Sequence, residues 1–200
     1  ESIEYAFDEN VGYLTSCPTN VGTGMRASYM MHLPALEWSG QLQNIFQAIG
    51  KLGITVRGLY GEGTGAEGSL YQISNQITLG QSEKEMISNL NNITLQIAGQ
   101  EKQIRERILK EREVEFQDRI YRSYGTLRYA RSLNTKEAIT LLSDIKMGFE
   151  MGILNEPKPT IGFYEFTMYI QPANLQKRLG IDLSSQERDM QRATFIREHF

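Results

Sequence analysis

The chain contains little of what would mark several protein classes. Cys17 is its one cysteine, so no disulfide can form within the chain, and a reducing cytoplasm is the expected compartment. No apolar run reaches the length that spans a bilayer, so we expect no membrane helix. Neither sign of charge dominates, because the chain has 21 Lys and Arg residues and 24 Asp and Glu residues. The resulting net charge of −3 argues against direct nucleic-acid binding.

The N-terminus also lacks two features. The chain begins at Glu1 without an initiator methionine, and no basic segment precedes an apolar stretch. We therefore expect no signal peptide, and we expect the chain to be part of a longer protein. Its 200 residues suffice for one sizeable core, or for one domain with a small satellite.

The first third of the chain is predicted to form strands and loops. Ranges 27–33, 54–59 and 70–74 are apolar or β-branched and are predicted strands. Apolar residues at helical spacing predict one helix over 36–52, ending at Gly53. Four glycines within 61–68 predict a mobile loop. The loop matches G-x-G-x-x-G, but a strand follows it, which excludes the dinucleotide motif.

The rest of the chain is predicted to be helical. A Ser or Asn followed three residues later by Glu is typical of a helix start. This pattern occurs at Ser82 and Glu85, Asn134 and Glu137, and Ser184 and Glu187. The predicted fold class is therefore α+β, an antiparallel β-sheet flanked by helices and followed by a helical C-terminal region. We place the two domains at 1–113 and 114–200.

Three short motifs carry the chemical information. Residues 17–28 are CPTNVGTGMRAS, residues 57–62 are RGLYGE, and residues 71–75 are YQISN. This set closely resembles the ATP:guanido phosphotransferases (phosphagen kinases), and within that family the bacterial protein-arginine kinases. The resemblance implies that 1–113 is the C-terminal part of the catalytic domain. It also implies transfer of the ATP γ-phosphoryl group to a guanidinium nitrogen, with ATP and Mg²⁺ as cofactors.

Phosphorylating a guanidinium group sets three requirements. The acceptor is a cation with a pKa above about 12, so a carboxylate must orient it and remove its proton. The triphosphate is anionic, so arginines and Mg²⁺ must balance its charge. Water must be excluded, because ATP would otherwise be hydrolysed. A glycine-rich loop with a carboxylate serves the first and third requirements, and arginines on strands serve the second.

The resemblance places Cys17 against the acceptor guanidinium as a thiolate. A hydroxyl nearby, from Thr15, Ser16 or Thr19, and the cationic substrate would favour the thiolate. We expect Cys17 to position the substrate rather than to form a covalent intermediate. Without the surrounding motif, a buried structural cysteine would be the simpler interpretation.

The resemblance also assigns the charged residues. Arg26 and Arg57 would clamp the nucleotide phosphates, for which bidentate guanidinium groups are suited. Glu62 would hold and deprotonate the acceptor, and Glu67 on the same loop is a weaker candidate. Surface salt bridges and solvated loop acids are the alternatives. No metal-binding set of protein residues is predicted.

Two departures and one further motif indicate the protein-directed branch. Met30 replaces a histidine, and Gln72 replaces an aspartate, of the small-molecule kinases. Arg188, Asp189 and Arg192 match the R-D-x-x-R-A motif of protein-arginine kinases, which the resemblance makes an allosteric phosphoarginine-binding pocket. Arg188 and Arg192 share a helix face, where a phosphate between them would relieve their repulsion, and Asp189 would pair with the ligand guanidinium. The alternative is an Asp189–Arg192 surface pair with Arg188 solvated.

The resemblance implies the biological role. Proteins with exposed arginines would be the substrates, and phosphoarginine would mark them for a Clp-type chaperone-protease in stress response and quality control. A zinc-binding activator protein is the expected partner, and a homo-oligomer is possible. Family members carry a catalytic glutamate and further arginines upstream of this segment, so we expect the isolated chain to be inactive or nearly so.

Three alternative functions stay open. A free-guanidino kinase of the arginine or creatine type is opposed by Met30, Gln72 and the C-terminal motif. A phosphoarginine-binding regulatory module without kinase activity would suit a chain that lacks the upstream half. The third is a helical scaffold whose motifs are relics.

Overall fold

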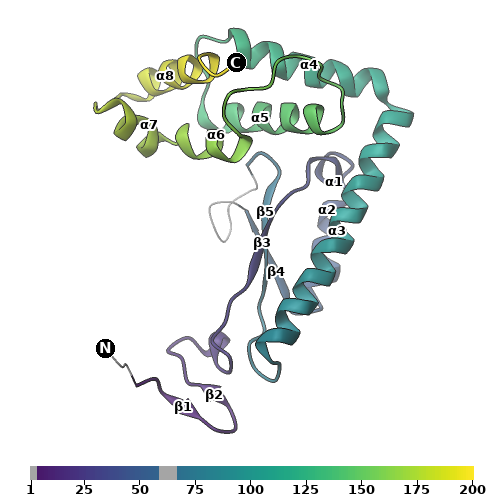
Figure 1. The fold of residues 1–200 in the computed structure, drawn as a ribbon, viewed down its shortest axis with the longest axis vertical. Coiled ribbons are helices and arrows are strands. Elements are labelled where there is room, and N and C mark those ends of the chain that lie inside the picture. The colour runs from purple at the N-terminus through teal and green to yellow at the C-terminus, as the bar shows by residue number, and fades with distance from the viewer. Residues whose placement is uncertain (1–3, 59–66) are drawn as a thin grey trace. The chain divides into compact units, whose positions relative to one another are not determined.

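The protein is described by a computed structural model that covers residues 4–58 and 67–200 (Figure 1). The chain divides into two compact units, one of Glu1–Ala66 with Leu70–Ile104, the other of Glu67–Ser69 with Arg105–Phe200. The division falls inside one long helix, α3 (Glu83–Glu111). Each unit is described by itself below.

The first unit is built on a three-stranded antiparallel sheet. Its strands are β3 (Ser28–His32), β4 (Ile54–Gly58) and β5 (Leu70–Asn75), in the order β3-β5-β4. A separate hairpin pairs β1 (Phe7–Asp8) with β2 (Gly12–Tyr13). All three strands of the sheet were predicted from composition, and each is confirmed to within about two residues.

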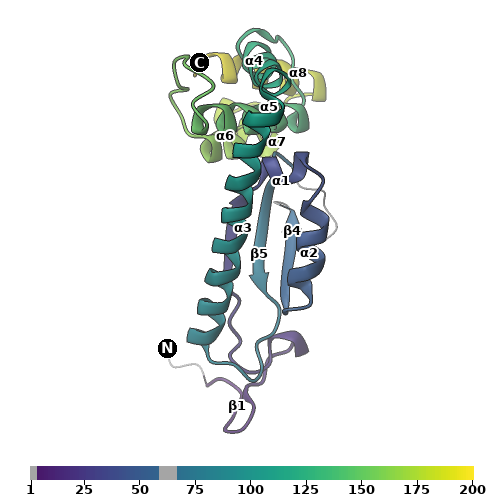
Figure 2. The same cartoon turned by 90° about the vertical axis from the view of Figure 1, so that its right-hand side faces the viewer.

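The pleat of the sheet separates its side chains into two faces. Tyr71 and Ile73 of β5 point to the face covered by helices, where the Tyr71 ring lies 5.0 Å from that of Phe46. Tyr29 of β3 lies on the same face and donates its hydroxyl hydrogen to Asn91 of α3. Figures 1 and 2 show α2 (Leu42–Gly50), which carries Phe46, and α3, which carries Asn91, alongside the strands. The opposite face carries the polar residues considered below.

The predicted single helix over 36–52 is wrong. The structure has two helices there, α1 (Pro34–Trp38) and α2 (Leu42–Gly50). They are separated at Gly40, whose φ of 71° is a left-handed conformation that glycine adopts readily. A short 3-10 helix, η1 (Pro18–Asn20), precedes the sheet.

The second unit consists of helices. They are α4 (Glu113–Tyr129), α5 (Thr135–Glu150), α6 (Phe163–Tyr169), α7 (Pro172–Leu179) and α8 (Ser185–Arg197), preceded by the last residues of α3. Helices α4 and α5 pack closely at Gly148, where an added Cβ would lie 2.4 Å from the Ile120 side chain. Among the described residues, no helix combines the length and apolarity that a membrane crossing needs.

The three predicted helix starts are confirmed to different degrees. Ser184 and Glu187 form a full capping box at α8. Ser82 and Glu85 make the same reciprocal bonds before α3, with Ser82 N–H donating to the Glu85 carboxylate at 2.9 Å. At α5, Asn134 accepts from the Glu137 N–H at 2.9 Å. Each cap satisfies backbone groups that the helix itself leaves without a partner.

Glu101 of α3 is a buried carboxylate that fixes the start of α1. Its two oxygens accept from the backbone N–H groups of Ala35 at 3.0 Å and Leu36 at 2.9 Å, and the residue is only 5% exposed. Pro34 has no N–H, so these are the first donors that α1 presents. A side chain from another helix therefore serves as the cap of α1.

Replacing this carboxylate should destabilise the first unit. We expect Glu101→Ala to lower the free energy of unfolding by about 3 kcal/mol, since two buried N–H groups would lose a charged acceptor. Urea titration followed by the fluorescence of Trp38, the single tryptophan and part of α1, measures this loss. Glu106→Ala, an exposed glutamate on the same helix, is the matched control. Equal losses in the two variants would contradict the capping role.

Candidate active site and C-terminal arginine cluster

A polar cavity lies on the open face of the sheet. Its volume is about 460 Å³, within the range of roughly 300–1,000 Å³ typical of small-molecule sites. Each lining side chain that the structure describes carries a polar atom or sulfur, and these are Cys17, Thr19, Asn20, Arg26, Ser28, Thr55, Arg57, Gln72, Ser74 and Gln76. Three of the predicted site residues, Cys17, Arg26 and Arg57, therefore line one cavity.

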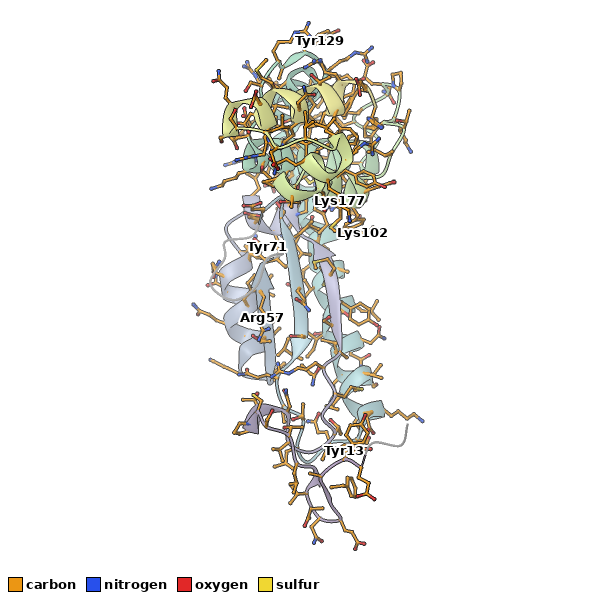
Figure 3. The ribbon with its side chains drawn as sticks, turned by 90° about the vertical axis from the view of Figure 1, so that its left-hand side faces the viewer. Tyr13, Arg57, Tyr71, Lys102, Tyr129 and Lys177 are labelled. Atoms are coloured by element: carbon orange, nitrogen blue, oxygen red, sulfur yellow. The ribbon has the colours of Figure 1, made fainter. Side chains whose placement is uncertain are left out.

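Strand register explains why Arg57 faces this cavity. Arg57 pairs with Gln72, Thr55 pairs with Ser74, and Ser28 pairs with Ser74 from the other side. Paired residues point to the same face of a sheet, so all five side chains lie on one surface. Figure 3 labels Arg57 on the sheet.

Arg26 is held by three acceptors. Its guanidinium group donates to Asn20 Oδ1 at 3.1 Å, to the backbone oxygen of Asn75 at 3.2 Å and to Thr19 Oγ1 at 3.3 Å. The acceptors come from η1 and from the end of β5. Arg26 is nevertheless exposed, so its own positive charge is accessible to an anion.

Asn75 is a supporting residue to which the sequence analysis assigned no role. Its Oδ1 accepts from the Ala27 N–H at 2.8 Å, and its Nδ2 donates to the oxygens of Met25 and Ile77 at 3.1 and 3.2 Å. The Asn75 side chain thus holds the segment that carries Arg26, and the Asn75 backbone oxygen accepts a hydrogen bond from that arginine. Its position at the end of the YQISN motif was the available signal.

Cys17 lies at the rim of the cavity, before η1. Its sulfur is 3.1 Å from the Thr19 hydroxyl, one of the three hydroxyls named from the sequence. Bonds from the Thr19 hydroxyl and then the Thr19 backbone amide, with a weaker contribution from the charge of Arg26, hold the pKa of the Cys17 thiol below its usual value. These local bonds therefore make the Cys17 thiolate easier to form than that of an ordinary cysteine.

The two loop carboxylates are not brought to this cavity by the described structure. Glu62 lies outside the described residues. Glu67 is described and belongs with the helical unit, next to Gly68, whose backbone packs against Ile139 of α5. The strand expected to follow the loop is present as β5, which is consistent with excluding a dinucleotide motif there.

The C-terminal motif has a different geometry from the one expected for two phosphate-facing arginines. Arg192 is 1% exposed and donates to the backbone oxygens of Ile170 at 2.9 Å and Leu133 at 2.7 Å. It also pairs with Asp189 at 2.6 Å. Arg188 is half-buried and donates to the Leu183 oxygen at 2.7 Å. The Asp189–Arg192 pair named as the alternative is present, but it is largely buried rather than on the surface.

Comparison of the sequence with models of protein families shows which family the chain is related to. The model described as the C-terminal catalytic domain of ATP:guanido phosphotransferases matches residues 1–104. The chain belongs to the ATP:guanido phosphotransferase family. A second model, the protein-arginine kinase McsB C-terminal domain, matches residues 113–200. The family resemblance seen in the motifs is thereby confirmed.

Two protein-arginine kinases that the chain matches agree with the family assignment. The chain is 51% identical over 196 residues to a protein-arginine kinase of Caldanaerobacter subterraneus subsp. tengcongensis, covering 98% of this chain and 58% of that protein. It is 52% identical over 200 residues to one of Pelotomaculum thermopropionicum, covering 100% of this chain and 56% of the relative. The crystal structure of lombricine kinase aligns with a TM-score of 0.44 and 35% identity, over 50% of this chain and 26% of that one. The chain thus spans little more than half the length of the curated relatives it matches.

The depressed thiol pKa makes a direct prediction. A group with a lowered pKa is ionised at lower pH, so alkylation of Cys17 by iodoacetamide should begin below the pH at which an ordinary thiol reacts. Thr19→Val removes the hydroxyl, and the alkylation profile should then shift to higher pH. Thr15→Val is the matched control, because the Thr15 hydroxyl bonds the Cys17 carbonyl and not its sulfur. Superimposable profiles for Thr19→Val and the unchanged chain would rule out the hydroxyl as the cause.

Proposed function

We propose that this chain is the C-terminal part of a protein-arginine kinase, which transfers the ATP γ-phosphoryl group to arginine side chains of proteins. The observation that carries the proposal is the single cavity that joins Cys17, Arg26 and Arg57 on the open face of the sheet. The names of the relatives, protein-arginine kinase in both cases, support the protein-directed reaction. Residues 1–113 would carry the chemistry, and 114–200 would regulate it.

The cavity suits the nucleotide end of this reaction. Arg57 projects from a sheet strand, and Arg26 is held by Asn20 and the end of β5 before any ligand arrives. Positive charge fixed in advance stabilises charge that develops on the transferred phosphoryl group, because no reorganisation is needed. Arg26 and Arg57 would therefore grip the phosphates.

The acceptor end would use Cys17 and the loop carboxylates. A Cys17 thiolate attracts the cationic guanidinium group and orients it without bonding to it. The guanidinium nitrogen then attacks the γ-phosphorus, the bond from that phosphorus to the ADP oxygen breaks, and the nitrogen's proton passes to Glu62. Glu67 is the weaker candidate for holding the acceptor.

The cavity is compatible with Mg²⁺ carried on the nucleotide. Its lining includes hydroxyl and amide oxygens, from Ser28, Ser74 and Gln72, and no carboxylate among the residues that the structure describes. Mg²⁺ commonly keeps several waters and binds through substrate phosphates, so these oxygens would contact its waters. When bound, the ion would neutralise charge on the phosphates.

The C-terminal motif would bind phosphoarginine as an allosteric ligand. Arg188 would contact the phosphate, and Asp189, which is 28% exposed, would pair with the guanidinium part. Arg192 would hold Asp189 in place from the core rather than bind the phosphate itself. A regulatory module that binds phosphoarginine without kinase activity is the second candidate function, and the same geometry favours it.

The remaining parts of the role rest on the family resemblance. Proteins with exposed arginines would be the substrates in the cytoplasm, and a Clp-type chaperone-protease would degrade the marked proteins. A zinc-binding protein would activate the kinase. A homo-oligomer is compatible with the proposal.

Nucleotide binding provides the first test. Mg-ATP should bind the chain in calorimetric titration, and Arg57→Ala should weaken binding about tenfold or more, since a charge-assisted contact contributes roughly 1.5–3 kcal/mol. Arg107→Ala, an exposed arginine on α3, should leave the affinity unchanged. We expect no arginine phosphorylation of added protein by this chain alone; turnover would show that no upstream residues are required. Equal affinities in the two variants would remove Arg57 from the clamp.

Phosphoarginine binding provides the second test. Titration with phosphoarginine should show saturable binding that Arg188→Ala weakens about tenfold or more. Arg131→Ala, an exposed arginine in the same unit, should not change the affinity. Absent phosphoarginine binding, together with Arg57-dependent ATP binding, would leave a guanidino kinase of unknown substrate and favour the free-guanidino alternative. Phosphoarginine binding without ATP binding would favour the regulatory module.

A further inference from the structure

The second unit contains a cavity that the proposed function does not use. Its volume is about 250 Å³, and it lies between α5, residues 158–162 and α6. Arg188, Asp189 and Arg192 are not among its lining residues. The apolar wall consists of Leu142, Ile145, Phe149, Ile161, Phe163 and Phe166.

This wall has a buried floor and an accessible edge. Leu142, Ile145 and Phe166 are buried in the core, whereas Phe149, Ile161 and Phe163 are half-buried. The volume is below the roughly 300–1,000 Å³ of pockets that take drug-sized ligands. A single large apolar side chain is therefore a better fit than a nucleotide or a cofactor.

Charged residues at this cavity are mostly cations. Lys146, Glu150 and Lys158 line it. Glu150 is paired with both Lys146 and Arg105, the latter at 2.8 Å. Although burial opposes ionisation, these two cations hold the pKa of the Glu150 carboxyl below its usual value, so it is charged at neutral pH. Two cations against one carboxylate among the lining residues leave an excess of one positive charge.

Lys158 is the cation that this network does not use. It is exposed, and it makes no ion pair with any residue that the structure describes. By contrast, the Lys146 ammonium group is fixed on Glu150, and it lies 5.9 Å from the ring centroids of both Phe163 and Tyr164. The rim therefore offers one accessible positive charge beside an apolar pocket.

We propose that this pocket docks a segment of a partner protein in which a large apolar side chain is followed or preceded by a carboxylate. The apolar side chain would enter between Phe149, Ile161 and Phe163, and the carboxylate would pair with Lys158. Charge complementarity argues for an acidic segment, since the same rim would repel a basic one. A phosphate is less suited, because the accessible donor is a lysine and not a bidentate arginine.

The docking surface stands independently of the proposed chemistry. It needs neither the cavity on the sheet nor phosphoarginine binding by Arg188. It would give an enzyme that acts on proteins a contact outside the reaction site, and a regulatory module a second contact with its partner.

The test uses the 200-residue chain and two short peptides. We would titrate fluorescein-labelled Glu-Leu-Phe-Glu, blocked at its C-terminus, and the matched Lys-Leu-Phe-Lys peptide, and follow anisotropy together with amide NMR shifts. The acidic peptide should bind more tightly and shift residues around Phe149 and Ile161. Lys158→Glu should weaken the acidic peptide about tenfold and strengthen the basic one. Lys177→Glu, an exposed lysine on α7 labelled in Figure 3, is the matched control and should change neither.

Several results would overturn the proposal. They are the absence of saturable binding up to about 1 mM acidic peptide, equal binding of both peptides to the unchanged chain, and an unaltered affinity in Lys158→Glu. Amide shifts at the pocket that depend on protein concentration alone would mean that a second copy of the chain fills it, which would also contradict the proposal. Lys158 is exposed, so its replacement should leave the fold intact, and the thermal unfolding midpoint would verify this.

Discussion

The candidate site depends on the register of β5 between β3 and β4. Gln72 stands opposite both Met30 and Arg57, so the arginine faces the polar side of the sheet. A slip of one residue would turn Arg57 toward the side that the helices cover, because alternate residues of a strand face opposite ways. Asn75 opposes a slip of β5 against β3, since its side chain is bonded to Met25 and Ala27, which lead into β3, and to Ile77 of its own segment. One amide side chain, which does not line the cavity, thus holds the segment that carries Arg26 against the end of β5.

In the helical unit, the corresponding constraint is the buried guanidinium group of Arg192. Taking this charge out of water is costly, and the cost is offset only because two backbone oxygens and Asp189 receive its hydrogen bonds. These acceptors lie at the end of α6, in the connection before α5 and on α8 itself. The same arginine therefore fastens three separate segments, and Asp189 owes its orientation to it.

Much of the fold could be predicted from the sequence, and the reasons are local. The strands carry apolar or β-branched residues, and the helix starts carry capping pairs that act within four residues. The break between α1 and α2 was missed because the helical spacing continues across Gly40, whose conformation spacing alone does not reveal.

The supporting residues could not be identified from the sequence, because their hydrogen-bond partners are far away along the chain. Glu101 is 66 residues from Ala35, and Arg192 is 59 from Leu133. Spacing in a helix tells which residues share a face, but not whether that face is covered, so Arg192 was expected to meet a ligand. Cys17 and Thr19 are two residues apart, so their contact was within reach of sequence reasoning.

The Thr19 hydroxyl is shared between the sulfur of Cys17 and the guanidinium group of Arg26, at 3.1 and 3.3 Å. Two groups that share a hydrogen-bonding partner are thermodynamically linked, and the linkage is reciprocal. If an anion bound at Arg26 changes the free energy of ionising the Cys17 thiol, then ionisation of the thiol changes the free energy of binding that anion by the same amount. The Cys17 and Arg26 ends of the cavity would then be coupled through a single oxygen atom.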